Sequence, residues 1–345
     1  MIDALPLPWP HAVLDRGTER RAVEGFLDSA RAGGAYRTMV LTGGKTLVKD
    51  GRIVFLDPTV LPAGGNAIFL GSSTPALTGV AVDTDLLLAP VPDPDPDDDG
   101  AGLTRLAPGS TLLGYREAAA SLDAADALVF IEANAIANWH RSHTHCPRCG
   151  APTVPESGGW VRRCSADGTE HFPRTDPAII VAVVGADDRI LLGGGSSWES
   201  NRYSTLAGFV EPGESLEQAV VREIAEEVGV RLHSPRYLAS QSWPFPASLM
   251  LGFIAYTDDD VATPDGVEVT RARWFTRPEL QSAVLGGEVT IPPRMSIARA
   301  LIEHWHGGPI AEPTPPAMAA VADGSSPVAE PTPPANPGSQ AAGRG

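Results

Sequence analysis

The stretch GFVEPGESLEQAVVREIAEEVGV, residues Gly208–Val230, decides the fold of this chain of 345 residues. Ser215 belongs to the residue types favoured at helix N-caps, and Gly229 is typical of the position that ends a helix. The residues between them favour helix. The sequence therefore predicts one helix that begins after Ser215 and stops at Gly229.

Three glutamates of this helix are spaced so that their carboxylates gather. Glu223 and Glu227 are four residues apart and share one helical face, and Glu226 lies at the edge of that face. Like charges at this spacing destabilise an isolated helix. A divalent cation between them removes that cost, because Mg²⁺ and Mn²⁺ prefer carboxylate oxygens. The alternative interpretation is a solvated acidic face without a ligand.

The order of residues in this stretch resembles the signature of the Nudix hydrolases: Gly, five residues, Glu, seven residues, Arg-Glu-aliphatic-any-Glu-Glu-any-Gly-aliphatic. The matching residues are Gly208, Glu214, Arg222, Glu223, Ile224, Glu226, Glu227, Gly229 and Val230. Members of this family split a nucleoside diphosphate linked to another moiety, and they depend on divalent metals. The resemblance implies an α/β fold, an α/β/α Nudix sandwich with a mixed sheet.

The resemblance also assigns roles to single residues. The implied ligands of Mg²⁺ or Mn²⁺ are the carbonyl of Ala207, Glu223, Glu227 and, as a ligand or behind the ligands, Glu226. Arg222 would brace the acidic cluster and orient Glu214. Bound cations neutralise pyrophosphate oxygens and lower the pKa of a water molecule, so that hydroxide attacks phosphorus at neutral pH. The general base stays open between Glu226, Glu227 and an acidic loop residue.

A second informative stretch, SQSWPFPASLM at Ser240–Met250, follows the helix. Its two prolines fix φ and remove two backbone donors, so the sequence predicts a stiff loop or edge segment that holds Trp243 and Phe245. Such a frame suits stacking of a purine or a nicotinamide ring. The alternative interpretation is a hydrophobic rim or a dimer contact.

The pattern SQ-any-WPFP-any-S after the Nudix signature resembles the NADH pyrophosphatase branch, which also removes NAD caps from RNA. The chain departs from it at Ser242, where the branch has a small or turn-forming residue such as Pro. The resemblance implies substrate contacts from Phe172, Gln241, Ser242, Trp243, Pro244, Phe245, Pro246, Ala247, Ser248 and Ala298. It also places Glu268 at an additional metal-ligand position.

The region 143–175 holds all three cysteines of the chain, Cys146, Cys149 and Cys164. A stretch this small and poor in apolar residues usually needs a metal to fold. The resembled branch has a four-cysteine zinc ribbon here, but the fourth position in this chain is Asp167. We expect structural Zn²⁺ with Asp167 as fourth ligand, and His171 or His145 as alternatives. A ribbon that has lost its metal and a redox-active cysteine pair are the other interpretations.

The chain divides into four predicted regions: an N-terminal α/β domain over 1–140, a zinc-ribbon-like segment over 141–175, a Nudix domain over 176–306 and a disordered Pro-rich tail over 307–345. In the first region, short apolar runs predict strands at Thr38–Leu41, Ile53–Leu56, Ala67–Leu70 and Asp85–Ala89. Tyr115–Arg141 predicts two helices with a break near Ser121–Asp123. Ala178–Gly185 predicts a buried strand that opens the Nudix domain.

The charge and composition limit the partners. With 26 basic and 42 acidic residues the formal charge is −16, which disfavours nonspecific wrapping of a long nucleic acid. The acidic run 93–99 predicts a solvated loop. No run of 18 apolar residues and no secretory signal is found, and three cysteines cannot form a disulfide framework. We therefore expect a cytoplasmic protein without a membrane span.

Together these features predict an NAD⁺ diphosphatase that cleaves NADH or NAD⁺ into AMP and nicotinamide mononucleotide, and that also removes the NAD cap from RNA. The resemblance further implies a homodimer. Two alternatives stay open: a Nudix hydrolase of ADP-ribose or dinucleoside polyphosphates, and a noncatalytic nucleotide sensor or RNA-binding module on a Nudix scaffold.

Overall fold

The computed structural model describes residues 5, 7, 14–27, 36–57, 67–73, 84–90, 101–119 and 121–313. The chain forms two compact units. The C-terminal unit comprises Met1–Leu7, Asp176–Gln241 and Ser248–Gly345. The N-terminal unit comprises Pro8–Thr175 and Ser242–Ala247. The predicted acidic loop at 93–99 and residues 314–345 of the tail predicted over 307–345 lie outside the described residues. The first residues of that predicted tail pack on the C-terminal unit, where Ile310 is buried and its carbonyl accepts a hydrogen bond from Arg299.

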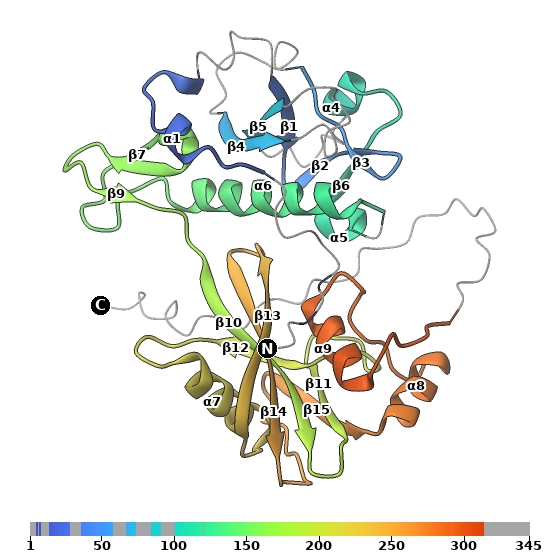
Figure 1. Cartoon of the computed structure of the whole chain (residues 1–345). Coiled ribbons are helices and arrows are strands. Elements are labelled where there is room, and N and C mark those ends of the chain that lie inside the picture. Colours follow the sequence, from blue (N-terminus) through green and yellow to red (C-terminus); the bar gives the residue numbers. More distant parts are fainter. Residues whose placement is uncertain are drawn as a thin grey trace, which may run out of the picture. The chain divides into compact units, whose positions relative to one another are not determined.

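The C-terminal unit is a mixed sheet between helices (Figure 1). Its strands are β10 (Asp176–Gly185), β11 (Ile190–Gly195), β12 (Leu206–Phe209), β13 (His233–Trp243), β14 (Ser248–Thr257) and β15 (Val269–Phe275). Its helices are α7 (Leu216–Val228), α8 (Arg277–Leu285) and α9 (Ile297–His306). The strand order is β13-β14-β10-β11-β15, with β12 also paired to β10. The pairing of β10 with β14 is parallel and its pairings with β11 and β12 are antiparallel.

Strand β10 is the central strand and is buried on both faces, as the apolar run predicts. Side chains of a strand alternate between its two faces. Facing α7 are Ile179, Val181 and Val183. Facing α8 and α9 are Ile180, Ala182 and Val184. Helices therefore cover both faces of the sheet, and the predicted α/β/α sandwich is confirmed.

Helix α7 begins and ends where the sequence predicts. The Oγ atom of Ser215 accepts a hydrogen bond from the backbone N–H of Gln218, and the Gln218 side chain accepts one from the N–H of Ser215, 2.7 Å away. Gly229 ends the helix with a positive φ of 69°, a conformation that glycine adopts without strain. These two caps fix which turns of α7 carry the glutamates.

The N-terminal unit contains small sheets and helices. Its strands are β1 (Tyr36–Leu41), β2 (Lys45–Lys49), β3 (Arg52–Ile53), β4 (Ile68–Ser73), β5 (Thr84–Pro90), β6 (Thr111–Gly114), β7 (Thr153–Glu156), β8 (Val161–Cys164) and β9 (Glu170–His171). Its helices are α1 (Thr18–Arg21), α4 (Ala101–Leu106), α5 (Tyr115–Ala118), α6 (Ala124–Ser142) and the 3-10 turn η2 (Ser157–Gly159). The sheets have the orders β1-β5-β4, β3-β2-β6 and β7-β8-β9.

Most elements expected in this unit are present. Helices α5 and α6 confirm the predicted break near Ser121–Asp123, and the Asp123 side chain caps α6 by accepting from the N–H of Asp126. The prediction of a strand over Ile53–Leu56 was wrong beyond Ile53. Val54 still donates to the carbonyl of Leu47 in β2, but Leu56 forms an isolated bridge with Thr38 of β1. The segment therefore links two sheets rather than extending one.

Among the described residues, no helix is long and apolar enough to cross a membrane.

Candidate metal and substrate sites

The carboxylate of Glu223 lies directly against the backbone of β12. A Cβ atom added to Gly208 would lie 2.0 Å from Cδ of Glu223 and 2.3 Å from each of its carboxylate oxygens. Gly208 sits in β12 opposite Ile179 of β10, so its backbone is held in place by the sheet. Glycine at this position is therefore required by the close approach of a side chain from α7.

Arg222 ties the acidic residues together. Its guanidinium donates from Nε and Nη2 to the two carboxylate oxygens of Glu214, at 3.0 and 2.5 Å. Nη1 lies 2.9 Å from Oε1 of Glu223 and donates to Oε2 of Glu226 at 2.9 Å. Nη2 also donates to the carbonyl of Phe209. These bonds lower the pKa of Glu214 and fix the loop before α7 to the helix.

Glu227 is the least compensated acid of the cluster. It is 7% exposed, and its Oε2 atom has no hydrogen-bond partner among the described residues. Burial, followed by the charges of Glu223 and Glu268, raises its pKa to about 9. Burial also raises the pKa of Glu223. Buried carboxylates that repel one another, with one oxygen unpaired, are the donor set that a hard divalent cation satisfies.

The other two implied carboxylate ligands differ in their surroundings. The side chain of Glu226 is 62% exposed, and its carboxylate is bound by Arg222. This places Glu226 at the outer edge of the cluster, as its spacing from Glu223 predicts. Glu268 precedes β15, and its charge contributes to the raised pKa of both Glu223 and Glu227. The structure therefore brings Glu268, remote in sequence, to the cluster on α7.

Asp265 is a residue of this site that the sequence reasoning missed. Its carboxylate accepts hydrogen bonds from the backbone N–H groups of Val267, Glu268 and Val269 at 2.9 to 3.2 Å. Its own N–H donates to the carbonyl of Glu227 at 2.9 Å. Asp265 therefore fastens the loop of Glu268 to the end of α7. The dipeptide Asp265-Gly266 is a turn signal that could have pointed to this role.

The cysteine segment forms a compact set of possible ligands. Side-chain ligand atoms of Cys146, Cys149, Cys164 and Asp167 all lie within 4.8 Å of one another. The sulfur atoms of Cys149 and Cys164 are 3.4 Å apart, and a tetrahedral zinc site with Zn–S bonds of about 2.3 Å requires a separation of roughly 3.8 Å. Three thiols and a carboxylate gathered this closely are a donor set that Zn²⁺ takes, and Cys149 and Cys164 would have to separate slightly to bind it.

The neighbouring histidines lie outside this set of four. Burial raises the pKa of the Cys146 thiol, but the N–H groups of Arg148 and Cys149 and the side chain of His171 outweigh it and bring the pKa to about 7. His171 therefore contacts the cluster through Cys146. His145 bonds to the hydroxyl of Thr144. Asp167 completes the set of four, and His171, whose buried Nε2 atom has no hydrogen-bond partner among the described residues, stays the alternative fourth ligand.

The predicted aromatic platform belongs to the N-terminal unit. The half-buried rings of Trp243 and Phe245 meet edge to face with centroids 5.0 Å apart. The guanidinium of Arg116 lies 5.9 Å from the Trp243 centroid and 5.5 Å from the Phe245 centroid. Phe172, also in this unit, is 60% exposed. The aromatic side chains named by the resemblance thus all retain surface that a ligand could cover.

The side chain of Gln241, which precedes this platform in the sequence, makes its hydrogen bonds within the C-terminal unit. It is buried, its Nε2 donates to the carbonyl of Met295, and its Oε1 accepts from the N–H of Ile297 at 2.7 Å. It therefore holds the first turn of α9, where Ala298 is also buried. The structure gives the side chain of Gln241 a packing role, and its contact with substrate stays a prediction. Ser248 is buried, whereas Ser242 and Pro246 are exposed.

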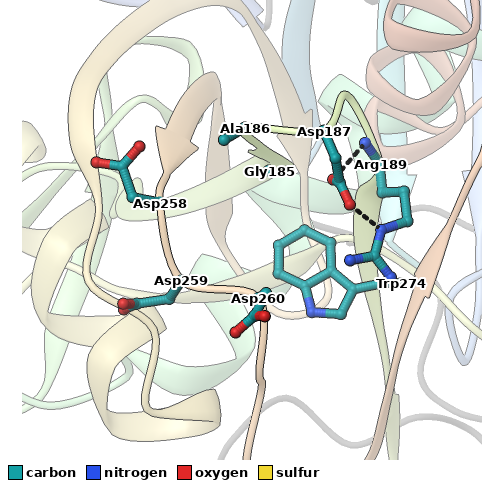
Figure 2. A pocket seen from close by; sticks show the side chains of 8 residues that line it. All are labelled: Gly185, Ala186, Asp187, Arg189, Asp258, Asp259, Asp260 and Trp274. Atoms are coloured by element: carbon teal, nitrogen blue, oxygen red, sulfur yellow. Dashed lines mark hydrogen bonds and ion pairs between the residues drawn. The ribbon is translucent and has the colours of Figure 1, made fainter.

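A separate shallow pocket lies near the far end of β10 (Figure 2). It is lined by Gly185, Ala186, Asp187, Arg189, Asp258, Asp259, Asp260 and Trp274. Gly208 pairs with Ile179, and Gly185 is six residues further along β10, a distance of about 20 Å at ~3.3 Å per residue. Asp187 is bound by Arg189, which stacks on Trp274. The pocket is therefore distinct from the carboxylate cluster.

The contact between Gly208 and Glu223 predicts the effect of Gly208→Ala. The added methyl group would displace the Glu223 carboxylate while the sheet stays intact, because the clash is with the end of a flexible side chain. We expect Mn²⁺ affinity to fall at least about tenfold, or about 1.4 kcal/mol, in a titration followed by electron paramagnetic resonance. Gly102→Ala, whose Cβ would meet nothing within 4 Å, is the matched control. Equal Mn²⁺ affinity of Gly208→Ala and wild type would contradict the assignment.

The raised pKa of Glu227 predicts a pH dependence of the metal-free protein. Folding raises this pKa from 4.5 to about 9, so the stabilisation is complete below 4.5 and is lost as the pH rises through 9. In the presence of EDTA, we expect the urea midpoint to decline between pH 5 and 9 more steeply for wild type than for Glu227→Gln. Parallel pH profiles of the two proteins would show that Glu227 titrates normally.

Comparisons with known proteins agree with this geometry. Residues 174–292 match the NUDIX domain family, and residues 141–172 match the NADH pyrophosphatase zinc ribbon domain. A protein named NAD-capped RNA hydrolase NudC from Stutzerimonas stutzeri is 40% identical over 208 residues, which cover 60% of this chain and 72% of that protein.

Two further relatives carry similar names. NAD-capped RNA hydrolase NudC of Mycobacterium tuberculosis is 44% identical over 183 residues, covering 50% of this chain and 58% of that protein. NAD-capped RNA hydrolase NUDT12 of Homo sapiens is 38% identical over 192 residues, covering 52% and 42%. The chain thus spans about half the length of these two relatives. It belongs to the Nudix family, and the stretch that precedes its Nudix domain in the sequence matches the NADH pyrophosphatase zinc ribbon domain.

Proposed function

We propose that this protein hydrolyses the pyrophosphate bond of NADH or NAD⁺, giving AMP and nicotinamide mononucleotide, and cleaves the same bond in the NAD cap of RNA. The observation that carries the proposal is the pair of mutually repelling carboxylates of the half-buried Glu223 and the buried Glu227 in an intact Nudix signature. The segment Ser240–Met250 directs the proposal to NAD(H). The names of the relatives support cleavage of the NAD cap of RNA.

The metal site of the proposal uses Mg²⁺ or Mn²⁺. Its ligands would be the carbonyl of Ala207 and the carboxylates of Glu223, Glu226, Glu227 and Glu268. Bound cations would neutralise the phosphate oxygens and make a water molecule nucleophilic at neutral pH. The intact cluster also argues against a noncatalytic nucleotide sensor, because such a module has no need for buried carboxylates that destabilise the helix.

Arg222 and Asp265 position the carboxylates of this cluster before any cation binds. Arg222 fixes the orientation of Glu214, Glu223 and Glu226 through four side-chain contacts, so these acids reorganise little when cations and substrate arrive. Asp265 fixes the loop that carries Glu268. Removal of either positioning group would leave the glutamates in the chain but free to turn away from the site.

Substrate recognition in the proposal falls to residues outside the signature. The backbone and side chains of Gln241–Ser248, together with Phe172 and Ala298, would bind the dinucleotide. Trp243 and Phe245 offer ring faces for a nicotinamide or adenine ring, and base stacking of this kind contributes about 1–3 kcal/mol per base. With a net charge of −16, we expect binding of the capped 5′ end of an RNA rather than of its length.

The ribbon of the proposal binds structural Zn²⁺ through Cys146, Cys149, Cys164 and Asp167. Four protein ligands leave no open coordination position, so this metal would stabilise the fold and take no part in hydrolysis. A homodimer and a cytoplasmic location complete the proposal. The first rests on the resemblance, and the second on the small number of cysteines.

Turnover of small substrates tests the proposed activity. With Mg²⁺ or Mn²⁺ we expect kcat/KM for NADH or NAD⁺ to exceed that for ADP-ribose, and Glu227→Gln to lose at least about a hundredfold in kcat while still binding the substrate. Glu217→Gln, the same change at an exposed position of α7, is the control and should retain activity. A preference for ADP-ribose, or full activity of Glu227→Gln, would overturn the proposal.

Zinc content tests the ribbon. We expect one zinc ion per chain by elemental analysis and a loss of it in Cys164→Ala, because three remaining ligands do not hold the metal firmly. Asp167→Asn should lower zinc retention against a chelator, whereas His145→Ala should match wild type. A wild-type protein purified without zinc, and stable in that form, would refute this part of the proposal.

A further inference from the structure

Two asparagines of helix α6 hydrogen-bond to the backbone of the segment Ser242–Ala247. The side-chain amide of Asn134 donates to the carbonyl of Pro244 at 3.0 Å. The amide of Asn138, one turn further along the helix, donates to the same carbonyl at 2.8 Å and to the carbonyl of Pro246 at 3.1 Å. Two side chains thus make three hydrogen bonds to the backbone of one short segment.

The orientation of the Asn138 amide is itself fixed. Arg141 donates from Nη2 to Oδ1 of Asn138 at 2.7 Å, so the oxygen of the amide faces the arginine and its NH₂ group faces the loop. Asn134 is 3% exposed, which leaves it little freedom to turn away. The pair therefore acts as a rigid double donor on one face of α6.

These three hydrogen bonds hold the segment Ser242–Ala247 where its backbone makes few other hydrogen bonds. Pro244 and Pro246 have no N–H group, so neither can tie the segment down by donating. The two carbonyls held by the asparagines belong to the residues on either side of Phe245, so the bonds restrain the backbone from which its side chain leaves. Trp243 and Phe245 also pack on the ring of Tyr115, at centroid distances of 6.3 and 5.9 Å. The result is a pair of half-exposed rings on a backbone clamped from one side.

We propose that Asn138, supported by Asn134, is a positioning residue that presents Trp243 and Phe245 to a flat ring of the dinucleotide substrate. The inference rests on the proposed hydrolysis of NAD(H). Neither asparagine needs to touch the substrate. We call the three hydrogen bonds from Asn134 and Asn138 the clamp. Because the clamp acts on ring stacking and not on the carboxylate cluster, its loss weakens substrate binding and leaves the chemical step nearly unchanged.

The primary variant is Asn138→Asp, which keeps the size of the side chain but turns its donor into a second acceptor that faces two carbonyls. We expect KM for NADH to rise about five- to tenfold, with kcat within about twofold of wild type. Asn201→Asp makes the same chemical change at a half-buried asparagine of the C-terminal unit, whose NH₂ group donates to the hydroxyl of Thr290 and the carbonyl of Gly287, and it should leave both constants unchanged. Asn138→Ala, which favours helix, gives the same expectation without a new charge.

Amide hydrogen exchange of the free protein reports on the clamp without any substrate. In both Asn138 variants we expect faster exchange in peptides covering residues 240–250 than in wild type or Asn201→Asp. Unchanged KM and unchanged exchange in both variants would overturn this inference while wild-type turnover of NADH upholds the proposed function. A fall in kcat without a change in KM would also overturn it. A wild-type protein that leaves NADH intact would overturn the proposed function and, with it, the substrate role of the clamp.

Discussion

The structure depends on one unfavourable contact, the crowding of acidic side chains on a single face of α7 against the backbone of β12. Glu223 occupies the space that a side chain at Gly208 would need, and Glu227 is buried with one carboxylate oxygen unpaired among the described residues. Arg222 offsets part of this charge by binding Glu214, Glu223 and Glu226. It does not reach Glu227, whose pKa is raised to about 9. The remaining charge is what a divalent cation would neutralise.

This constraint explains why the signature has its spacing. The caps Ser215 and Gly229 set the rotation of α7, the pairing of Gly208 with Ile179 sets the position of β12, and the two together bring Glu223 to the strand. Asp265 then adds Glu268 from a loop about forty residues later in the sequence. Each of these residues helps to place the carboxylates. The free-energy cost of gathering them therefore arises on folding, before any ligand binds.

Local patterns in the sequence predicted the elements that local forces decide. The bounds of α7 followed from its caps, the buried strand β10 from its apolar run, and Asp167 from its spacing to Cys164. Long-range side-chain bonds left no such pattern. Asn134 and Asn138 hydrogen-bond to a segment more than one hundred residues away, and the side-chain amide of Gln241 hydrogen-bonds to the start of α9. Ile53–Leu56 failed as a strand for the same reason, because its bridging partner lies in another sheet.

We propose that the acids of α7 bind the catalytic cations. Anomalous diffraction from crystals soaked with Mn²⁺ and a nonhydrolysable dinucleotide tests it directly. We expect anomalous peaks within about 2.0–2.3 Å of carboxylate oxygens of Glu223 and Glu227, beside the carbonyl of Ala207. Manganese bound at other positions, with these two carboxylates unoccupied, would contradict it.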